Sequence, residues 1–94
     1  MKVWELEIAW NDHKDVNWRD KYMFFGIYTN PQHAKHDAEQ YLSLLFGGWL
    51  EPYWRRFGRY SNIIYGSFCP SGTENEVAIV RIYQREVYQK PHYD

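Results

Sequence analysis

The residues most able to do chemistry lie together near the middle of the chain, in the stretch GGWLEPYWRRFGRY over residues 47–60. This stretch holds five aromatic side chains and three arginines in fourteen residues. Trp, Tyr and Arg are the residue types most enriched in the hot spots of protein interfaces. Aromatic rings that stack on bases, beside arginines that hold phosphates, are also how proteins bind single-stranded nucleic acid. In a third interpretation the rings close the core and the arginines extend outward over them.

We predict that this stretch binds another protein. The formal net charge of −1 separates the two binding interpretations, because proteins that hold phosphates usually carry a basic excess. Single-stranded nucleic-acid binding is therefore the alternative. The core and interface interpretations are compatible if Trp49 is buried while Trp54 and the arginines are exposed. The residues predicted to contact the partner are Trp54, Arg55, Arg56, Arg59 and Tyr60, with a second cluster at Trp18 and Arg19.

A second group of cationic and aromatic residues lies near the end of the chain. Arg81, Tyr83 and Arg85 occupy alternate positions of a predicted strand, so that the three side chains share one face. These side chains either extend the surface predicted for residues 47–60 or are the charged residues that edge strands commonly carry.

Other side chains that could react or bind metal lack a supporting pattern. Cys69 has no local signature with a base, so we expect a small buried hydrophobe. Glu5 and Glu7 are two residues apart on a predicted strand and should both face solvent, where charged side chains are common, so they do not indicate acid–base catalysis. His33 and His36 are one helical turn apart, but their spacing matches no well-known metal signature. We therefore predict no enzymatic activity, no cofactor and no metal.

The composition is that of one small globular domain. Hydrophobic residues make up 45% of the 94 residues and aromatic residues 20%, which is more rings than so short a chain readily buries. Cys69 is the only cysteine, so no internal disulfide can form. The first residues lack the apolar run of a signal peptide, and no apolar stretch approaches membrane-spanning length. We expect a cytoplasmic protein with no membrane partner.

Hydrophobic periodicity predicts four strands and one main helix. Residues 3–10 alternate, with Trp4, Leu6, Ile8 and Trp10 on one buried face. The helix begins after the cap Asn30 and ends at Gly47 and Gly48. Its expected apolar stripe is Ala34, Ala38, Tyr41, Leu42 and Leu45. The other predicted elements are a loop over 11–21, strands over 22–28, 61–69 and 76–88, and a short second helix over about 51–57.

These elements predict an α+β fold in the order β-β-α-β-β. The expected structure is a four-stranded antiparallel sheet with the main helix packed on one face and the short second helix beside it. Residues 1–94 form a single domain, and residues 89–94 are expected to be a mobile tail. If the long last strand lies at a sheet edge, two copies could pair through it, so a homodimer is a further prediction.

Three segments also carry a resemblance to known proteins. VWELEIAW (residues 3–10), FFGIYTNPQHAKHDAEQYL (24–42) and VAIVRIYQREV (77–87) together resemble small uncharacterised bacterial and bacteriophage ββα-type proteins. Compact, aromatic-rich proteins of this kind are often phage-encoded inhibitors of host or defence proteins, including anti-CRISPR proteins. The resemblance implies an inhibitor acting in a host cytoplasm. It transfers no site residue, and the stretch over 47–60 has no counterpart in it.

Overall fold

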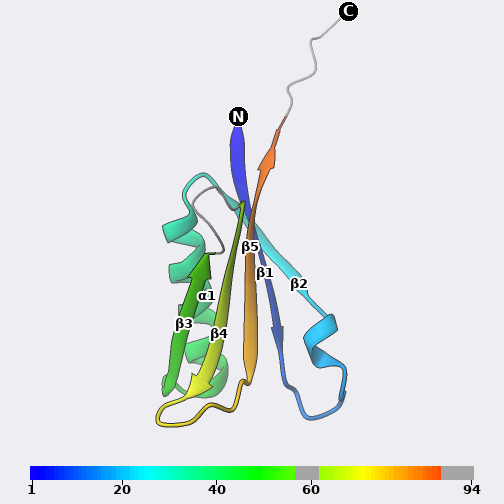
Figure 1. Cartoon of the computed structure of the whole chain (residues 1–94), viewed down its shortest axis with the longest axis vertical. Coiled ribbons are helices and arrows are strands. Elements are labelled where there is room, and N and C mark those ends of the chain that lie inside the picture. Colours follow the sequence, from blue (N-terminus) through cyan, green and yellow to red (C-terminus); the bar gives the residue numbers. More distant parts are fainter. Residues whose placement is uncertain (57–61, 88–94) are drawn as a thin grey trace, which may run out of the picture.

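The computed structural model describes residues 1–56 and 62–87, which form an α+β structure with one main helix on a five-stranded antiparallel sheet (Figure 1). The sheet order is β2-β1-β5-β4-β3, so β2 and β3 are its edges. The strands are β1 (Lys2–Trp10), β2 (Met23–Tyr28), β3 (Leu50–Arg56), β4 (Ile63–Pro70) and β5 (Ala78–Glu86). The helix α1 spans Pro31–Phe46, and a single 3₁₀ turn, η1, spans Trp18–Asp20 between β1 and β2.

The fifth strand corrects the prediction from sequence. The segment predicted as a short helix over 51–57 is the strand β3, which pairs with β4 from Leu50↔Pro70 to Arg56↔Ile64. Gly47 and Gly48 both take positive φ, which ends α1 and turns the chain back toward the sheet. Pro52 is tolerated because β3 is an edge strand, where a missing N–H can face solvent.

The helix boundaries confirm the caps expected from sequence. The Asn30 side chain accepts a hydrogen bond from the Gln32 backbone N–H at 2.8 Å, and Gly47 ends the helix in the left-handed conformation. Ala34, Ala38 and Leu42 are fully buried, and the two alanines let the helix approach the sheet closely. Leu45 is exposed, contrary to prediction, and Phe46 packs against the core instead.

The core lies between α1 and one face of the sheet. Adjacent strands are in register, so that Leu6 on β1 lies opposite Ile82 on β5, which lies opposite Ile64 on β4. Side chains two residues apart along each strand then line the same face. The main buried residues of this face are Trp4, Leu6, Ile8, Ile64, Phe68, Ala78, Val80 and Ile82.

The face of β1 turned away from the helix is also partly buried. We predicted only one buried face for this strand, but Val3, Glu5 and Ala9 are buried as well. The turn η1 packs against β1 and brings in Trp18, whose side chain is 6% exposed. The polar loop between β1 and β2 therefore contributes a buried tryptophan beside β1.

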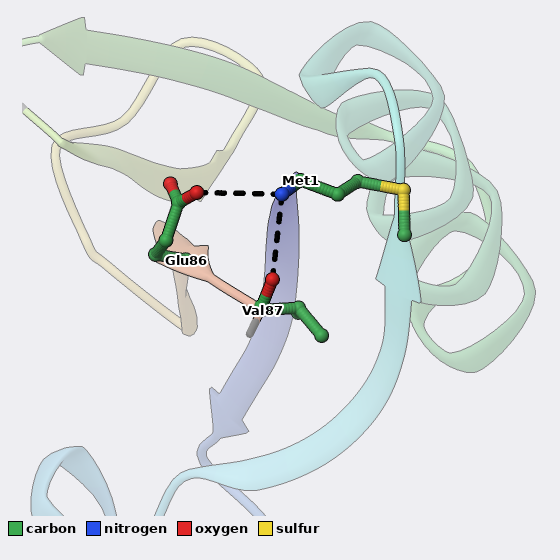
Figure 2. A network of polar contacts seen from close by, with 3 residues as sticks. All are labelled: Met1, Glu86 and Val87. Atoms are coloured by element: carbon green, nitrogen blue, oxygen red, sulfur yellow. Dashed lines mark hydrogen bonds and ion pairs between the residues drawn. The ribbon is translucent and has the colours of Figure 1, made fainter. Parts of the chain in front are cut away.

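The pairing of β1 with β5 continues to the first residue of the chain. The Val87 N–H donates to the Met1 carbonyl at 2.8 Å, and the Met1 nitrogen lies 3.3 Å from both Val87 O and Glu86 Oε1 (Figure 2). On its other side β5 pairs with β4. It is therefore an inner strand, and the edge position required for the predicted homodimer belongs to β2 and β3 instead. The predicted tail over 89–94 lies outside the described residues.

Candidate protein-interaction surface

The face of the sheet away from α1, which we call the open face, is rich in tyrosine and charged side chains. In Figure 1, α1 lies behind β3 and β4, so that the viewer looks onto the open face. Strand alternation directs every second residue to this face. Its polar and aromatic residues are Glu5 and Glu7 on β1, Glu51, Tyr53 and Arg55 on β3, Tyr65 and Ser67 on β4, and Arg81, Tyr83 and Arg85 on β5.

A shallow groove of about 360 Å³ crosses the open face. Its aromatic lining comes from Tyr53, Tyr65 and Tyr22, which lies just before β2. The Arg81 guanidinium stacks 4.3 Å from the centre of the Tyr22 ring. Burial raises the pKa of Tyr22 above its ordinary value. The remaining lining residues are Arg55, Gly66, Ser67, Glu76 and Ile79.

Beside the groove, two carboxylates of β1 are paired with arginines of β5. Glu7 Oε2 accepts from Arg81 Nη2 at 2.6 Å, and Glu5 Oε1 accepts from Arg85 Nη1 at 2.6 Å. Hydrogen bonding with the carboxylates of Glu5 and Glu7 raises the pKa of the Tyr83 phenol strongly. The prediction that Glu5 and Glu7 lie on a solvated face is wrong: Glu5 is 7% exposed, because the cross-strand arginines and Tyr83 cover it.

The interactions of Glu7 with Arg81 and Tyr83 lower the pKa of its carboxyl group. Burial on its own raises the pKa of this carboxyl, but the hydrogen bonds from Tyr83 and Arg81 and the positive charge of Arg81 lower it by more. Glu7 is therefore ionised in the folded protein. The arginines of β5 balance the charge of these carboxylates.

A further ion pair joins the loop between β1 and β2 to the edge of the groove. Arg19 Nε lies 3.0 Å from Glu76 Oε1, and the Ser67 hydroxyl donates to Glu76 Oε2 at 2.5 Å. Glu76 thus joins the turn η1 to β4. The Arg19 guanidinium also stacks 4.5 Å from the ring centre of Trp18.

Arg55 differs from the other arginines of this face. It is exposed and lines the groove, and no side chain among residues 1–56 and 62–87 forms an ion pair with it. Its strand neighbour Tyr53 is also exposed and donates to Glu51 Oε2 at 3.2 Å. Arg55 is therefore a cation held beside an aromatic groove and available to a ligand.

Strand alternation separates the residues predicted to form one surface. Trp54 and Arg56 point to the helix side, whereas Arg55 between them points to the open face. Trp54 Nε1 donates to Glu39 Oε1 of α1 at 2.8 Å, and the Arg56 guanidinium lies 5.6 Å from the ring centre of Trp4. Arg59 and Tyr60 lie outside the described residues.

The roles proposed for two tryptophans are reversed in the structure. Trp49, considered for the core, is 54% exposed, whereas Trp54, considered for the surface, packs against the core. The aromatic residues of the groove that we did not single out from sequence are Tyr22, Tyr53 and Tyr65. Tyr53 and Arg55 are two residues apart, and this spacing would have predicted a shared face if the segment had been recognised as a strand.

Three further observations concern metal binding, the cysteine and membrane helices. Within the part of the chain that is described, no group of three or more His, Cys, Asp or Glu side chains could hold a metal ion. Cys69 is buried, as expected of a small hydrophobe. The described helices include none with the length and apolar character needed to cross a membrane.

Comparisons of the chain with protein-family models, with curated proteins and with solved structures found no match. The function is therefore inferred from the chemistry of the open face.

Proposed function

We propose that the protein is a non-enzymatic binding module that docks another protein on the open face of its sheet. Arg55 is the charged anchor, and the exposed ring of Tyr53, together with Tyr22 and Tyr65 of the groove lining, provides the aromatic contact area. The observation that carries the proposal is the position of Arg55, an arginine without an ion pair among the described residues, at the wall of a tyrosine-lined groove. Tyrosine and arginine are the residue types that dominate interface hot spots.

The charge balance of the open face favours a protein over a nucleic acid. Arg19, Arg81 and Arg85 are each within 3.0 Å of a glutamate, so their positive charges are already balanced within the protein. These balanced pairs offer little net positive charge to a polyanion that approaches the face. A partner with one acidic side chain placed over Arg55, among apolar and aromatic neighbours, fits this distribution better than a continuous phosphate backbone.

The proposed consequence of docking is stoichiometric inhibition or adaptor action. A partner segment in the groove would bury the rings of Tyr53 and Tyr65. It would also exclude water from the ion pair between Arg55 and the partner's acidic side chain, which strengthens that ion pair. Some of the segments of this chain resemble small bacterial and bacteriophage proteins, and compact proteins of that kind are often phage-encoded inhibitors. We therefore propose bacterial host or defence proteins as the first partners to examine.

The experiment compares two adjacent arginines that point to opposite faces. Tagged wild-type protein and the Arg55→Ala and Arg56→Ala variants are used to capture partners from host lysate, and the affinity for any captured protein is then measured with each variant. We expect Arg55→Ala to weaken binding by about tenfold or more, which corresponds to the loss of about 1.4 kcal/mol at a hot spot. Arg56→Ala should bind nearly as well as the wild type. Equal binding by Arg55→Ala and the wild type would overturn the proposal.

The nucleic-acid alternative has a separate test. Titration of the intrinsic tryptophan fluorescence with a poly-dT oligonucleotide should show no saturable change for a protein-binding module. Saturable binding that weakens steeply with salt, and that Arg55→Ala reduces, would instead establish the alternative.

A further inference from the structure

The two edges of the sheet differ in a way that bears on self-association. Natural proteins protect edge strands with charges and prolines, because unpaired backbone N–H and C=O groups invite pairing with another chain. The edge strand β3 carries Pro52 and the charged residues Glu51, Arg55 and Arg56. The edge strand β2, with the sequence MFFGIY, carries neither a charge nor a proline.

The side chains of β2 make this edge strongly apolar. Met23, Phe24 and Ile27 are 54%, 59% and 58% exposed. A register shift between Leu6 and Glu7 on β1 places Phe24 opposite Glu7 and Ile27 opposite Glu5. In a regular strand, residues three apart point to opposite faces. The register shift adds one residue to β2 between Phe24 and Ile27, so both side chains lie on the open face.

We propose that β2 pairs antiparallel with β2 of a second copy of this chain, about a two-fold axis perpendicular to the sheet. The two five-stranded sheets then form one continuous sheet. Because this axis keeps both open faces on the same side, Phe24 and Ile27 of the two copies come together on one surface. Cross-strand contacts between aromatic and β-branched side chains stabilise such a pair of strands.

A second copy is the occupant that fits this edge best. Pairing of β2 with β3 of another molecule would be head-to-tail and would continue into open filaments unless it closed into a ring. Pro52 and the charges of β3 oppose that arrangement. Pairing of β2 with β2 uses the same apolar patch twice and closes at a dimer, with no charged residue of Met23–Tyr28 to be desolvated.

The size of the patch predicts a weak dimer. The exposed fractions of the three side chains correspond to about 350 Å² of apolar surface per copy, taking about 200 Å² for each full side chain. Two copies with their strand backbones then bury about 1,000 Å², which is at the low end of specific interfaces. We expect reversible association with a dissociation constant in the micromolar range or weaker. The proposal is independent of Arg55 and of the partner that binds the groove.

Sedimentation velocity across a concentration series tests the proposal. The wild-type mass should rise from the monomer value of 11.5 kDa toward twice that value as the concentration increases from about 1 µM to about 1 mM. The double variant Phe24→Lys/Ile27→Lys should remain monomeric, since it places like charges across the shared axis. The matched control Leu44→Lys makes the same kind of change on α1, at a side chain that is 87% exposed, and should associate as the wild type does.

Amide hydrogen exchange on the wild-type protein locates the interface without relying on a variant. Exchange of the β2 amides should slow as the protein concentration rises, whereas exchange of the β3 amides should not change. A wild type that stays monomeric over the whole range would overturn the proposal. Association that protects β3 or α1 in place of β2, or that survives in the folded double variant, would overturn it equally.

Discussion

The indole Nε1 of Trp54 donates a hydrogen bond to Glu39 Oε1 at 2.8 Å and so joins the edge strand β3 to the middle of α1. The Trp54 ring packs edge-to-face with Phe68, with 5.6 Å between the ring centres, and Lys35 Nζ lies 5.6 Å from the centre of the Trp54 ring. Gly66 on β4 provides the space beneath the ring. This tryptophan closes one side of the core, whereas Tyr53 and Arg55 beside it on the same strand are exposed.

We predict that Trp54→Phe lowers the free energy of unfolding by about 1 kcal/mol or more, because the variant keeps an aromatic ring but loses the hydrogen bond to Glu39. Urea denaturation followed by far-ultraviolet circular dichroism measures the change. Glu39→Gln is the matched control, since its amide oxygen can still accept from the indole, and it should cost less. A variant as stable as the wild type would show that the hydrogen bond contributes nothing.

We predict that Gly66→Ala destabilises the protein by about 1–3 kcal/mol, as is usual for overpacked sites. A Cβ atom at this position would lie 2.6 Å from the Trp54 ring, closer than two carbon atoms can approach. The clash depends on the ring, so the same substitution in a Trp54→Ala background should cost much less. Equal costs in the two backgrounds, measured by urea denaturation, would contradict the contact.

We predict that Glu7→Gln lowers the free energy of unfolding at neutral pH by about 1–2 kcal/mol, a value reduced by the partial exposure of Arg81. The pKa of Glu7 is lower in the folded protein than the ordinary value of 4.5. The carboxylate therefore stabilises the fold at pH values above 4.5, and this contribution is lost as the pH falls through the folded-state pKa.

The corresponding measurement is urea unfolding of both proteins at pH 7 and at about pH 3. The difference between wild type and Glu7→Gln should be largest at pH 7 and should shrink at the lower pH. A difference that stays constant across this range would mean that the ion pair with Arg81 is not its source.

The elements with a clear local pattern could be predicted from sequence. The alternation of Trp4, Leu6 and Ile8 marked β1, and Asn30 and Gly47 marked the two ends of α1, because each signal acts between residues close in the chain. The strand β3 was missed because Glu51-Pro52 is also typical of a helix start. Its strand conformation depends on pairing with β4, which lies beyond residue 62.

Local patterns of residues were enough to predict the α+β class, the caps of α1, the apolar stripe containing Ala34 and Ala38, and the concentration of rings and arginines near residues 47–60. Strand pairing, which brings together distant parts of the chain, sets which of these rings and arginines share a surface. A strand sends neighbouring residues to opposite faces, so Trp54 packs beneath α1 while Arg55 lines the groove. Whether an arginine is free or paired likewise depends on cross-strand partners such as Glu7 and Arg81, which are 74 residues apart in the chain.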